Sequence, residues 1–314
     1  MITSAKSGAY VTMVTPYNND NTVDYGAVRE LVRWYASSGL DGIFASCQSS
    51  EIWYLSLADR VKLAAVVRDE AEKCAVGGQR MQIVASGHVS NDFDEQVAEL
   101  SAVAATGVDA VILISNRMDI ADTSEDKWIS DTDRLIGHID ADVALGVYEC
   151  PLPYKRLMTD KMLSYCSANG RFFFMKDTCC DADMIARRLK VLGGGNMKLF
   201  NANAQTTLAS MLSGGAGYCG VMANFHPALY KWLCDNYAGD PRAQEISAQL
   251  SMMAFIEGMT YPACAKYHMR KYSGLNISEQ SRSCRASSFT PYQRSIVDAL
   301  AITERGIYEK LEIK

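Results

Sequence analysis

Two residues of the chain, Lys176 and Tyr148, have the chemical types and surroundings needed to act on a carbonyl group. Lys176 ends the run RFFFM at residues 171–175, which is apolar after Arg171, and is followed by Asp177. Burial among apolar groups disfavours the charged ammonium, which leaves more free amine to attack a ketone and form a Schiff base. A lysine that only pairs with Asp177 or leaves the strand into solvent is the alternative interpretation.

Tyr148 ends the preceding predicted strand, in the segment ALGVYECP at residues 144–151. Adjacent strands of a sheet lie about 5 Å apart, so the phenol and the amine of Lys176 are expected to face the same cavity. Condensation of an amine with a ketone needs a group that moves protons to and from the carbinolamine oxygen, and a phenol can do this. A tyrosine that only packs at the rim of the sheet is the alternative.

The polar run SCQSSE at residues 46–51 follows the second predicted strand. Hydroxyl and backbone N–H groups in a tight strand-to-helix connection can bind an anion, such as the carboxylate of a 2-keto acid. Serine-rich loops also form ordinary turns, so this run has weight only together with Lys176 and Tyr148. Arg117, after the fourth predicted strand, is a candidate for binding a carboxylate or hydroxyl of a second substrate.

Short apolar runs alternate with helical patterns over residues 1–225, and this alternation predicts the scaffold that positions these residues. The predicted strands cover residues 10–14, 42–46, 82–85, 110–114, 143–148, 172–176, 198–200 and 217–222. The helices between them cover residues 24–37, 57–73, 91–105, 124–138, 160–167, 182–192 and 204–212. Eight such units predict a (β/α)₈ TIM barrel with its active site at the carboxyl ends of the strands. An open doubly wound sheet is the alternative, but the first strand is not followed by a glycine-rich phosphate-binding turn.

From residue 226 the alternation gives way to helical patterns at residues 226–237, 241–259, 261–272 and 291–310. A polar stretch at residues 274–288 joins the last two, and we expect it to be the most flexible segment. The sequence therefore predicts a catalytic barrel of residues 1–225 and a C-terminal helical extension of residues 226–314 packed against it.

The composition argues against several classes of protein. Hydrophobic residues make up 48% of the chain, enough for a sizeable core, and charged residues 21%. A net charge of −5 without a basic cluster argues against nucleic acid as a partner, and no apolar run is long enough to span a membrane. The ten cysteines have no metal-binding spacing, and the first residues do not form a signal peptide pattern. We therefore expect reduced thiols, no metal and a cytoplasmic location.

The sequence resembles the dihydrodipicolinate synthase and N-acetylneuraminate lyase family of class I, lysine-dependent pyruvate aldolases. The segments that carry the resemblance are VTPY, SSEIWYLSLADR, VYECP, FFFMKDT, GGAGYCGVMANFHP and YPACAKYHMRKYSG, which together extend over nearly the whole chain. The resemblance implies that Lys176 is the Schiff-base lysine and Tyr148 the proton-shuttling tyrosine. It further implies that Gln48 and Ser49 hold the pyruvate carboxylate and that Cys219 lines the keto-acid pocket. A homotetramer without metal or organic cofactor is also implied.

The chain departs from the family pattern at three places. Gln48 replaces a hydroxyl residue of the proton relay, and residues 115–117 replace a tyrosine that a neighbouring subunit contributes. Pro153 stands where dihydrodipicolinate synthases have the arginine that binds the carboxylate of the second substrate. We therefore expect a Schiff-base-forming lyase or aldolase that acts on pyruvate or a related 2-keto acid and forms or cleaves a C–C bond with an aldehyde partner. A dihydrodipicolinate synthase using aspartate semialdehyde, a keto-acid dehydratase and an inactive ligand-binding barrel are the alternatives.

Overall fold

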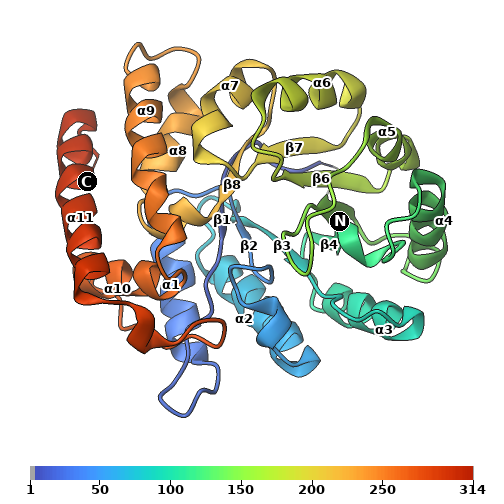
Figure 1. Cartoon of the computed structure of the whole chain (residues 1–314), viewed down its shortest axis with the longest axis horizontal. Coiled ribbons are helices and arrows are strands. Elements are labelled where there is room, and N and C mark those ends of the chain that lie inside the picture. Colours follow the sequence, from blue (N-terminus) through green and yellow to red (C-terminus); the bar gives the residue numbers. More distant parts are fainter. Residues whose placement is uncertain (1–3, 314) are drawn as a thin grey trace.

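The computed structural model describes residues 4–313, in which eight parallel strands close into one barrel (Figure 1). Each strand pairs with its neighbours in the sequence, and the last strand pairs with the first. The predicted (β/α)₈ barrel is therefore confirmed. The strands are β1 (Gly8–Thr12), β2 (Gly42–Phe44), β3 (Gln82–Ser86), β4 (Ala110–Ile114), β5 (Leu145–Tyr148), β6 (Phe172–Asp177), β7 (Lys198–Asn201) and β8 (Gly217–Gly220).

Helices cover the outside of the barrel and connect successive strands. They are α1 (Tyr25–Ser37), α2 (Leu57–Lys73), α3 (Phe93–Ala104), α4 (Glu125–Ile136), α5 (Asp160–Asn169), α6 (Ala182–Leu192) and α7 (Thr207–Leu212). Most of them begin at a side chain that accepts a hydrogen bond from a backbone N–H of the first turn, which otherwise has no partner in the helix. These N-cap residues are Asp24, Ser56, Asp92, Ser124, Thr159 and Asp181.

The interior of the barrel is a packed core of aromatic and aliphatic side chains. Phe174 stacks on Phe200 with ring centres 4.4 Å apart, and the edge of Tyr10 meets Phe200 at 4.8 Å. At Gly146 a Cβ atom would lie 2.6 Å from the carbonyl oxygen of Phe174, so only glycine lets β5 approach β6 this closely. Because the interior is filled, a ligand can bind only where the strands end.

The C-terminal part contributes α8 (Pro227–Asn236), α9 (Ala243–Met253), α10 (Ala263–Tyr272) and α11 (Pro291–Leu311). Figure 1 shows α9, α10 and α11 on one side of the barrel, whereas α8 packs against β1 and β8. The predicted boundary at residue 225 thus falls between the last strand and the helix that completes the barrel. One continuous hydrophobic core contains residues of the barrel, of α8 and of α11.

The polar stretch at residues 274–288 is irregular, as predicted, but it is tied to the barrel. Ser281 Oγ and the backbone N–H groups of Arg282 and Ser283 donate to Glu51 Oε1, at 2.7, 2.7 and 2.6 Å. These contacts do not support the expectation that this is the most flexible segment of the chain. They attach the C-terminal extension to the loop that follows β2.

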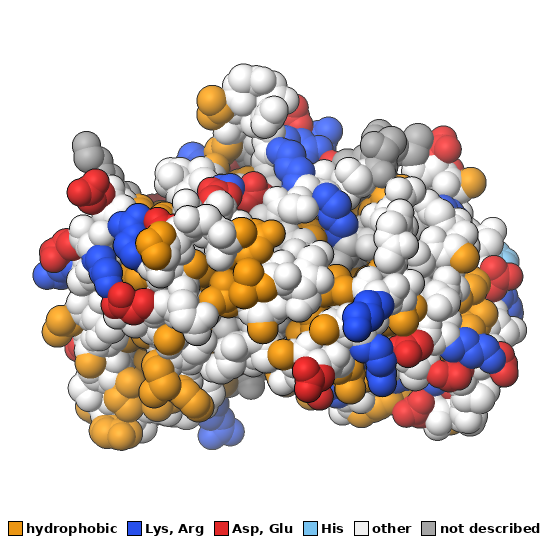
Figure 2. Space-filling model, turned by 90° about the horizontal axis from the view of Figure 1, so that it is seen from above, with side chains coloured by type: hydrophobic (Ala, Val, Ile, Leu, Met, Phe, Trp, Pro, Cys, Tyr) orange, Lys and Arg blue, Asp and Glu red, His pale blue; other side chains and the backbone are white. Residues whose placement is uncertain are grey.

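Basic and acidic side chains alternate over the face shown in Figure 2, so this face has no uniform positive field. No helix within residues 4–313 combines the length and the apolar character that a bilayer span needs.

Candidate active site

Lys176 and Tyr148 lie side by side at the carboxyl ends of β6 and β5. They are register partners in the sheet, and Lys176 Nζ lies 4.2 Å from the centre of the Tyr148 ring. Only 4% of the surface of Lys176 is exposed, and the ring of Phe44 lies 6.0 Å below the amine. The two residues that were expected to act together are therefore adjacent in a mostly apolar environment.

An ion-pair network on the outer side of the same two strands fixes their ends. Because side chains alternate along a strand, Glu149 and Asp177 point away from the interior into which Tyr148 and Lys176 project. The fully buried Arg188 of α6 pairs with both carboxylates, at 2.8 Å from Glu149 Oε1. Burial and the neighbouring Asp177 raise the pKa of Glu149 to about 7, against the opposing effect of Arg188. The network holds β5 and β6 in register and so orients the amine and the phenol.

A cavity of about 570 Å³ opens at the carboxyl ends of the strands, and Lys176 and Tyr148 form part of its wall. Gln48 and Ser49, predicted to hold a keto-acid carboxylate, line the same cavity. Four of the six predicted site residues are thus brought together around one space of the size that small-molecule sites have.

The loop that carries Gln48 and Ser49 is held in a tight turn by its own side chains. Ser50 Oγ accepts from the backbone N–H of Cys47 at 2.9 Å and donates to the carbonyl of Ala45 at 2.9 Å. Ser49 Oγ donates to Thr12 Oγ1 at 3.1 Å, which turns its hydroxyl toward the barrel mouth. Such a turn can present hydroxyl, amide and backbone donors to an anion.

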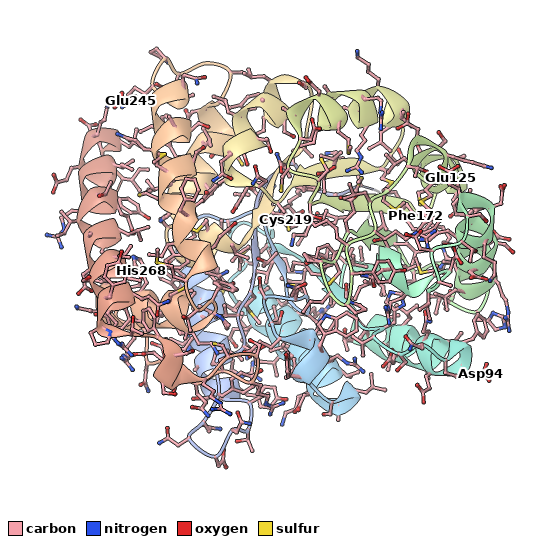
Figure 3. All side chains as sticks on the ribbon, in the orientation of Figure 1. Asp94, Glu125, Phe172, Cys219, Glu245 and His268 are labelled. Atoms are coloured by element: carbon pink, nitrogen blue, oxygen red, sulfur yellow. The ribbon has the colours of Figure 1, made fainter. Side chains whose placement is uncertain are left out.

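Cys219 and Arg117 do not line the cavity in the described chain. Cys219 lies on β8 near the centre of the barrel (Figure 3), where burial raises its pKa to about 12 and the nearby Lys176 opposes the shift. Arg117 is buried behind the wall, with its guanidinium 5.3 Å from the ring of Trp53 and bonded to Asn91 Oδ1 at 2.7 Å. Their predicted roles in substrate binding stay predictions.

Cys150 lies two positions after Tyr148 and contacts the loop that follows β2. Cys150 Sγ donates a hydrogen bond to Gln48 Oε1 at 3.4 Å. Cys150 is completely buried, and burial raises the pKa of both the phenol and the thiol. Because side chains alternate along a strand, a residue two positions after Tyr148 is expected on the same side of the sheet.

The rest of the cavity wall comes from strand ends and from the C-terminal extension. Thr178 and Asn203 follow β6 and β7, and Lys155 Nζ donates to the carbonyl oxygen of Thr178 at 2.9 Å. Glu257 and Tyr261 reach the cavity from the segment between α9 and α10. Among residues 4–313 no group of histidine, cysteine and acidic side chains is arranged to hold a metal ion.

Comparisons with sequence families and with individual proteins point to the same family of proteins. The model of a family described as the dihydrodipicolinate synthetase family matches residues 5–301. A 4-hydroxy-tetrahydrodipicolinate synthase of Ralstonia nicotianae is 27% identical over 230 residues, which cover 73% of this chain and 74% of that protein. The enzyme of the same name from Shewanella piezotolerans is 21% identical over 258 residues, covering 81% of this chain and 82% of its own.

Solved structures of similar fold cover nearly the whole chain. A chloride-inhibited dihydrodipicolinate synthase of Acinetobacter baumannii, complexed with pyruvate, has a TM-score of 0.82 at 18% identity and covers 95% of this chain and 99% of its own. CdNal of Clostridium difficile, in complex with mannosamine, has a TM-score of 0.80 at 15% identity, with coverage of 95% and 99%. At sequence identities of 18% and 15%, the structural similarity to these two proteins establishes the fold.

Proposed function

Because the chain belongs to the dihydrodipicolinate synthetase family, whose members are lysine-dependent lyases, we propose that it holds pyruvate or a related 2-keto acid as a Schiff base on Lys176. The observation that carries this proposal is the position of Lys176, buried at the mouth of the barrel with the Tyr148 ring 4.2 Å from its amine. An amine beside a proton donor is the arrangement that condensation with a ketone requires.

The residues divide the reaction between them. Lys176 Nζ adds to the keto carbon, and Tyr148 gives its phenolic proton to the former carbonyl oxygen. A second proton comes from the amine nitrogen, and the oxygen leaves as water to give a protonated imine. The imine then draws the electrons of a C–H bond at C3 of the keto acid, and the Tyr148 phenolate takes that proton. The resulting enamine adds to an aldehyde, and the same steps in reverse cleave the product. Gln48 and Ser49 hold the keto-acid carboxylate during these steps.

The partner of the keto acid is an aldehyde, and aspartate semialdehyde is expected to be a poor one. Pro153 stands at the place of the arginine that binds its carboxylate, and Pro153 has no donor to replace it. Turnover measured with pyruvate and a panel of aldehydes separates an aldolase of other specificity from a dihydrodipicolinate synthase. Release of water from a hydroxylated keto acid without an aldehyde would identify a dehydratase instead.

The test of the Schiff base is borohydride reduction in the presence of pyruvate, followed by mass spectrometry of the intact protein and of its peptides. We expect one pyruvate adduct per chain, on the peptide that contains Lys176, and none in Lys176→Ala. Lys155→Ala is the matched control, because Lys155 lies in the same cavity and should not be needed for the adduct. Turnover by Lys176→Ala, or an adduct on Lys155, would refute the assignment, and binding of pyruvate without an adduct would identify an inactive barrel.

The proposal also covers the oligomeric state of the protein, its location in the cell and the role of its C-terminal extension. We expect a homotetramer, as in the family, and light scattering at several protein concentrations measures its mass. A cytoplasmic location fits the cysteines, all ten of which are free thiols. The helical extension of residues 226–314 is proposed to complete the site, since Glu257 and Tyr261 line the cavity from it.

A further inference from the structure

The side-chain amide of Asn116 holds the segment that follows β5, residues 150–156, against the end of β4. Its Nδ2 donates to three carbonyl oxygens of this segment, those of Cys150 and Leu152 at 3.0 Å each and that of Tyr154. Asn116 is fully buried. A side chain that cannot donate would therefore leave these carbonyl oxygens without their partner.

Arg117 fixes the orientation of this amide. Its Nε donates to Asn116 Oδ1 at 3.0 Å, and its Nη1 donates to Asn91 Oδ1 at 2.7 Å. A guanidinium can only donate and a backbone carbonyl oxygen can only accept. The oxygen of the Asn116 amide must therefore face Arg117, and its N–H groups must face the segment after β5.

The segment held by Asn116 forms the outer part of the cavity wall, where Pro151, Leu152 and Lys155 line the space. Leu152 is 41% exposed, whereas Lys176 is 4% and Tyr148 2% exposed. The segment thus lies near the rim of the cavity and the catalytic pair near its floor. With the keto acid bound to Lys176, an aldehyde that enters from solvent comes to lie against the rim.

We propose that Asn116 is a positioning residue for the aldehyde partner of the reaction. By holding residues 150–155 in one conformation, it sets the shape of the rim and so the binding of the aldehyde, whereas the keto acid is held by other residues. Arg117 acts through Asn116 and does not itself contact a substrate. This inference rests on the proposed Schiff-base function, and its test measures the two halves of the reaction separately.

The variants are Asn116→Asp, which keeps the size of the side chain but has oxygens in place of the N–H donors, and Asn116→Ala. The first half of the reaction is followed without an aldehyde, as exchange of the C3 protons of pyruvate with D₂O and as the adduct trapped by borohydride. The second half is followed as kcat and KM at saturating pyruvate, with glycolaldehyde, glyceraldehyde or succinic semialdehyde. Thr132→Val is the matched control, because Thr132 is equally buried and loses one hydrogen bond within α4.

We expect both Asn116 variants to exchange and trap pyruvate within about twofold of the unmodified protein, while kcat/KM for the aldehyde falls about 10- to 100-fold, mostly through KM. Backbone amides of residues 150–156 should exchange with deuterium faster in both variants, but not in Thr132→Val. Arg117→Met should cause a smaller loss of the same kind for neutral and anionic aldehydes, and it should add little to Asn116→Ala.

Two results would overturn the role of Asn116. One is equal slowing of pyruvate exchange and of aldehyde addition, which indicates general damage to the fold, and the other is an aldehyde kcat/KM within about twofold of the unmodified protein. A loss in Arg117→Met that is confined to succinic semialdehyde would overturn the indirect role of Arg117. Arg117→Met leaves the amide in place, so it decides the matter even where neither Asn116 variant folds. Failure of the unmodified protein to form an adduct with pyruvate would instead refute the Schiff-base proposal.

Discussion

Replacement of Glu51 by glutamine tests how the C-terminal extension supports the substrate loop. Glu51 follows the loop of Gln48 and Ser49 and is buried, with a left-handed backbone conformation at φ 63°. Its Oε1 accepts three hydrogen bonds of 2.6–2.7 Å from residues 281–283, and its Oε2 lies 3.6 Å from the buried Nζ of Lys266. Glutamine keeps the shape and one acceptor oxygen but removes the charge.

The cost of Glu51→Gln follows from these contacts. Hydrogen bonds to a charged group contribute about 1.5–3 kcal/mol and neutral ones about 0.5–1.5 kcal/mol, so three bonds lose roughly 3 kcal/mol. Lys266 would also be left buried without a carboxylate, and breaking a buried pair costs about 3–5 kcal/mol. Because both effects describe the same charge they overlap, and we expect the free energy of unfolding to fall by about 3–5 kcal/mol.

The pH dependence of this loss has a definite sign. Burial lowers the pKa of Lys266 to about 8, against the opposing effect of Glu51. The unfolded chain therefore binds more protons than the folded one between about pH 8 and the ordinary lysine pKa of about 10.4, and stability from this group rises across that range. Without the carboxylate the pKa of Lys266 falls further, so the deficit of Glu51→Gln should shrink as the pH rises above 7.

Urea unfolding at fixed protein concentration measures the change, and KM for pyruvate reports on the loop. We expect a raised KM, because Gln48 and Ser49 lose the support of residues 281–283. The double variant Glu51→Gln, Lys266→Met removes the unpaired cation and should recover at least about 2 kcal/mol of the loss. A loss below about 1 kcal/mol in the single variant, or no recovery in the double one, would contradict this account of the contact.

Two further predictions concern the terminal helix and an exposed thiol. Burial alone would raise the pKa of Glu304, but His226 and His268 hold it at about 2, so its stabilising effect is complete above about pH 4.5 and is lost as the pH falls toward 2. Glu304→Gln should therefore flatten the dependence of Tm on pH over that range, and an unchanged slope would show that the pairing contributes nothing. Cys180 is exposed and lines the cavity, so a maleimide should label it before the buried thiols and block adduct formation. Pyruvate should slow this labelling and Cys180→Ser should resist it, whereas adduct formation by the fully labelled protein would exclude Cys180 from the entrance.

The ends of the strands could be predicted where an apolar run gives way to polar residues. Lys176 follows four apolar positions that face either the barrel interior or the helices, and β6 ends one residue later. The last strand was predicted to reach Met222 but ends at Gly220, because residues 221–224 form a turn of 3₁₀ helix. Met222 is buried under the helices, and hydrophobicity alone does not distinguish such a turn from a strand.

The residues that contact Lys176, Tyr148 and their neighbours were harder to predict from the sequence than Lys176 and Tyr148 themselves. Strand alternation implies that Glu149 and Asp177 point outward and need a counter-charge, but it does not indicate that Arg188 on α6 supplies it. Similarly, alternation places Cys150 on the side of Tyr148, while its hydrogen bond to Gln48 depends on side-chain conformation. Local periodicity gives the direction of a side chain, and the identity of its partner depends on packing between elements.

The part of the cavity wall that the C-terminal extension forms could not be predicted from the sequence, for a different reason. Glu257 and Tyr261 lie more than 80 positions after Lys176 in a segment that is neither strand nor regular helix, so no periodicity relates them to the strand ends. Their position follows from how α9 and α10 pack on the barrel and from the anchoring of residues 281–283 on Glu51. In the proposed reaction, residues from β5, β6 and the loop after β2 hold the keto acid, so we expect the aldehyde on the side of the cavity that the extension supplies. On this proposal, the residues that select the aldehyde lie largely outside the strands that carry Lys176 and Tyr148, which is why the sequence indicates the reaction before it indicates the substrate.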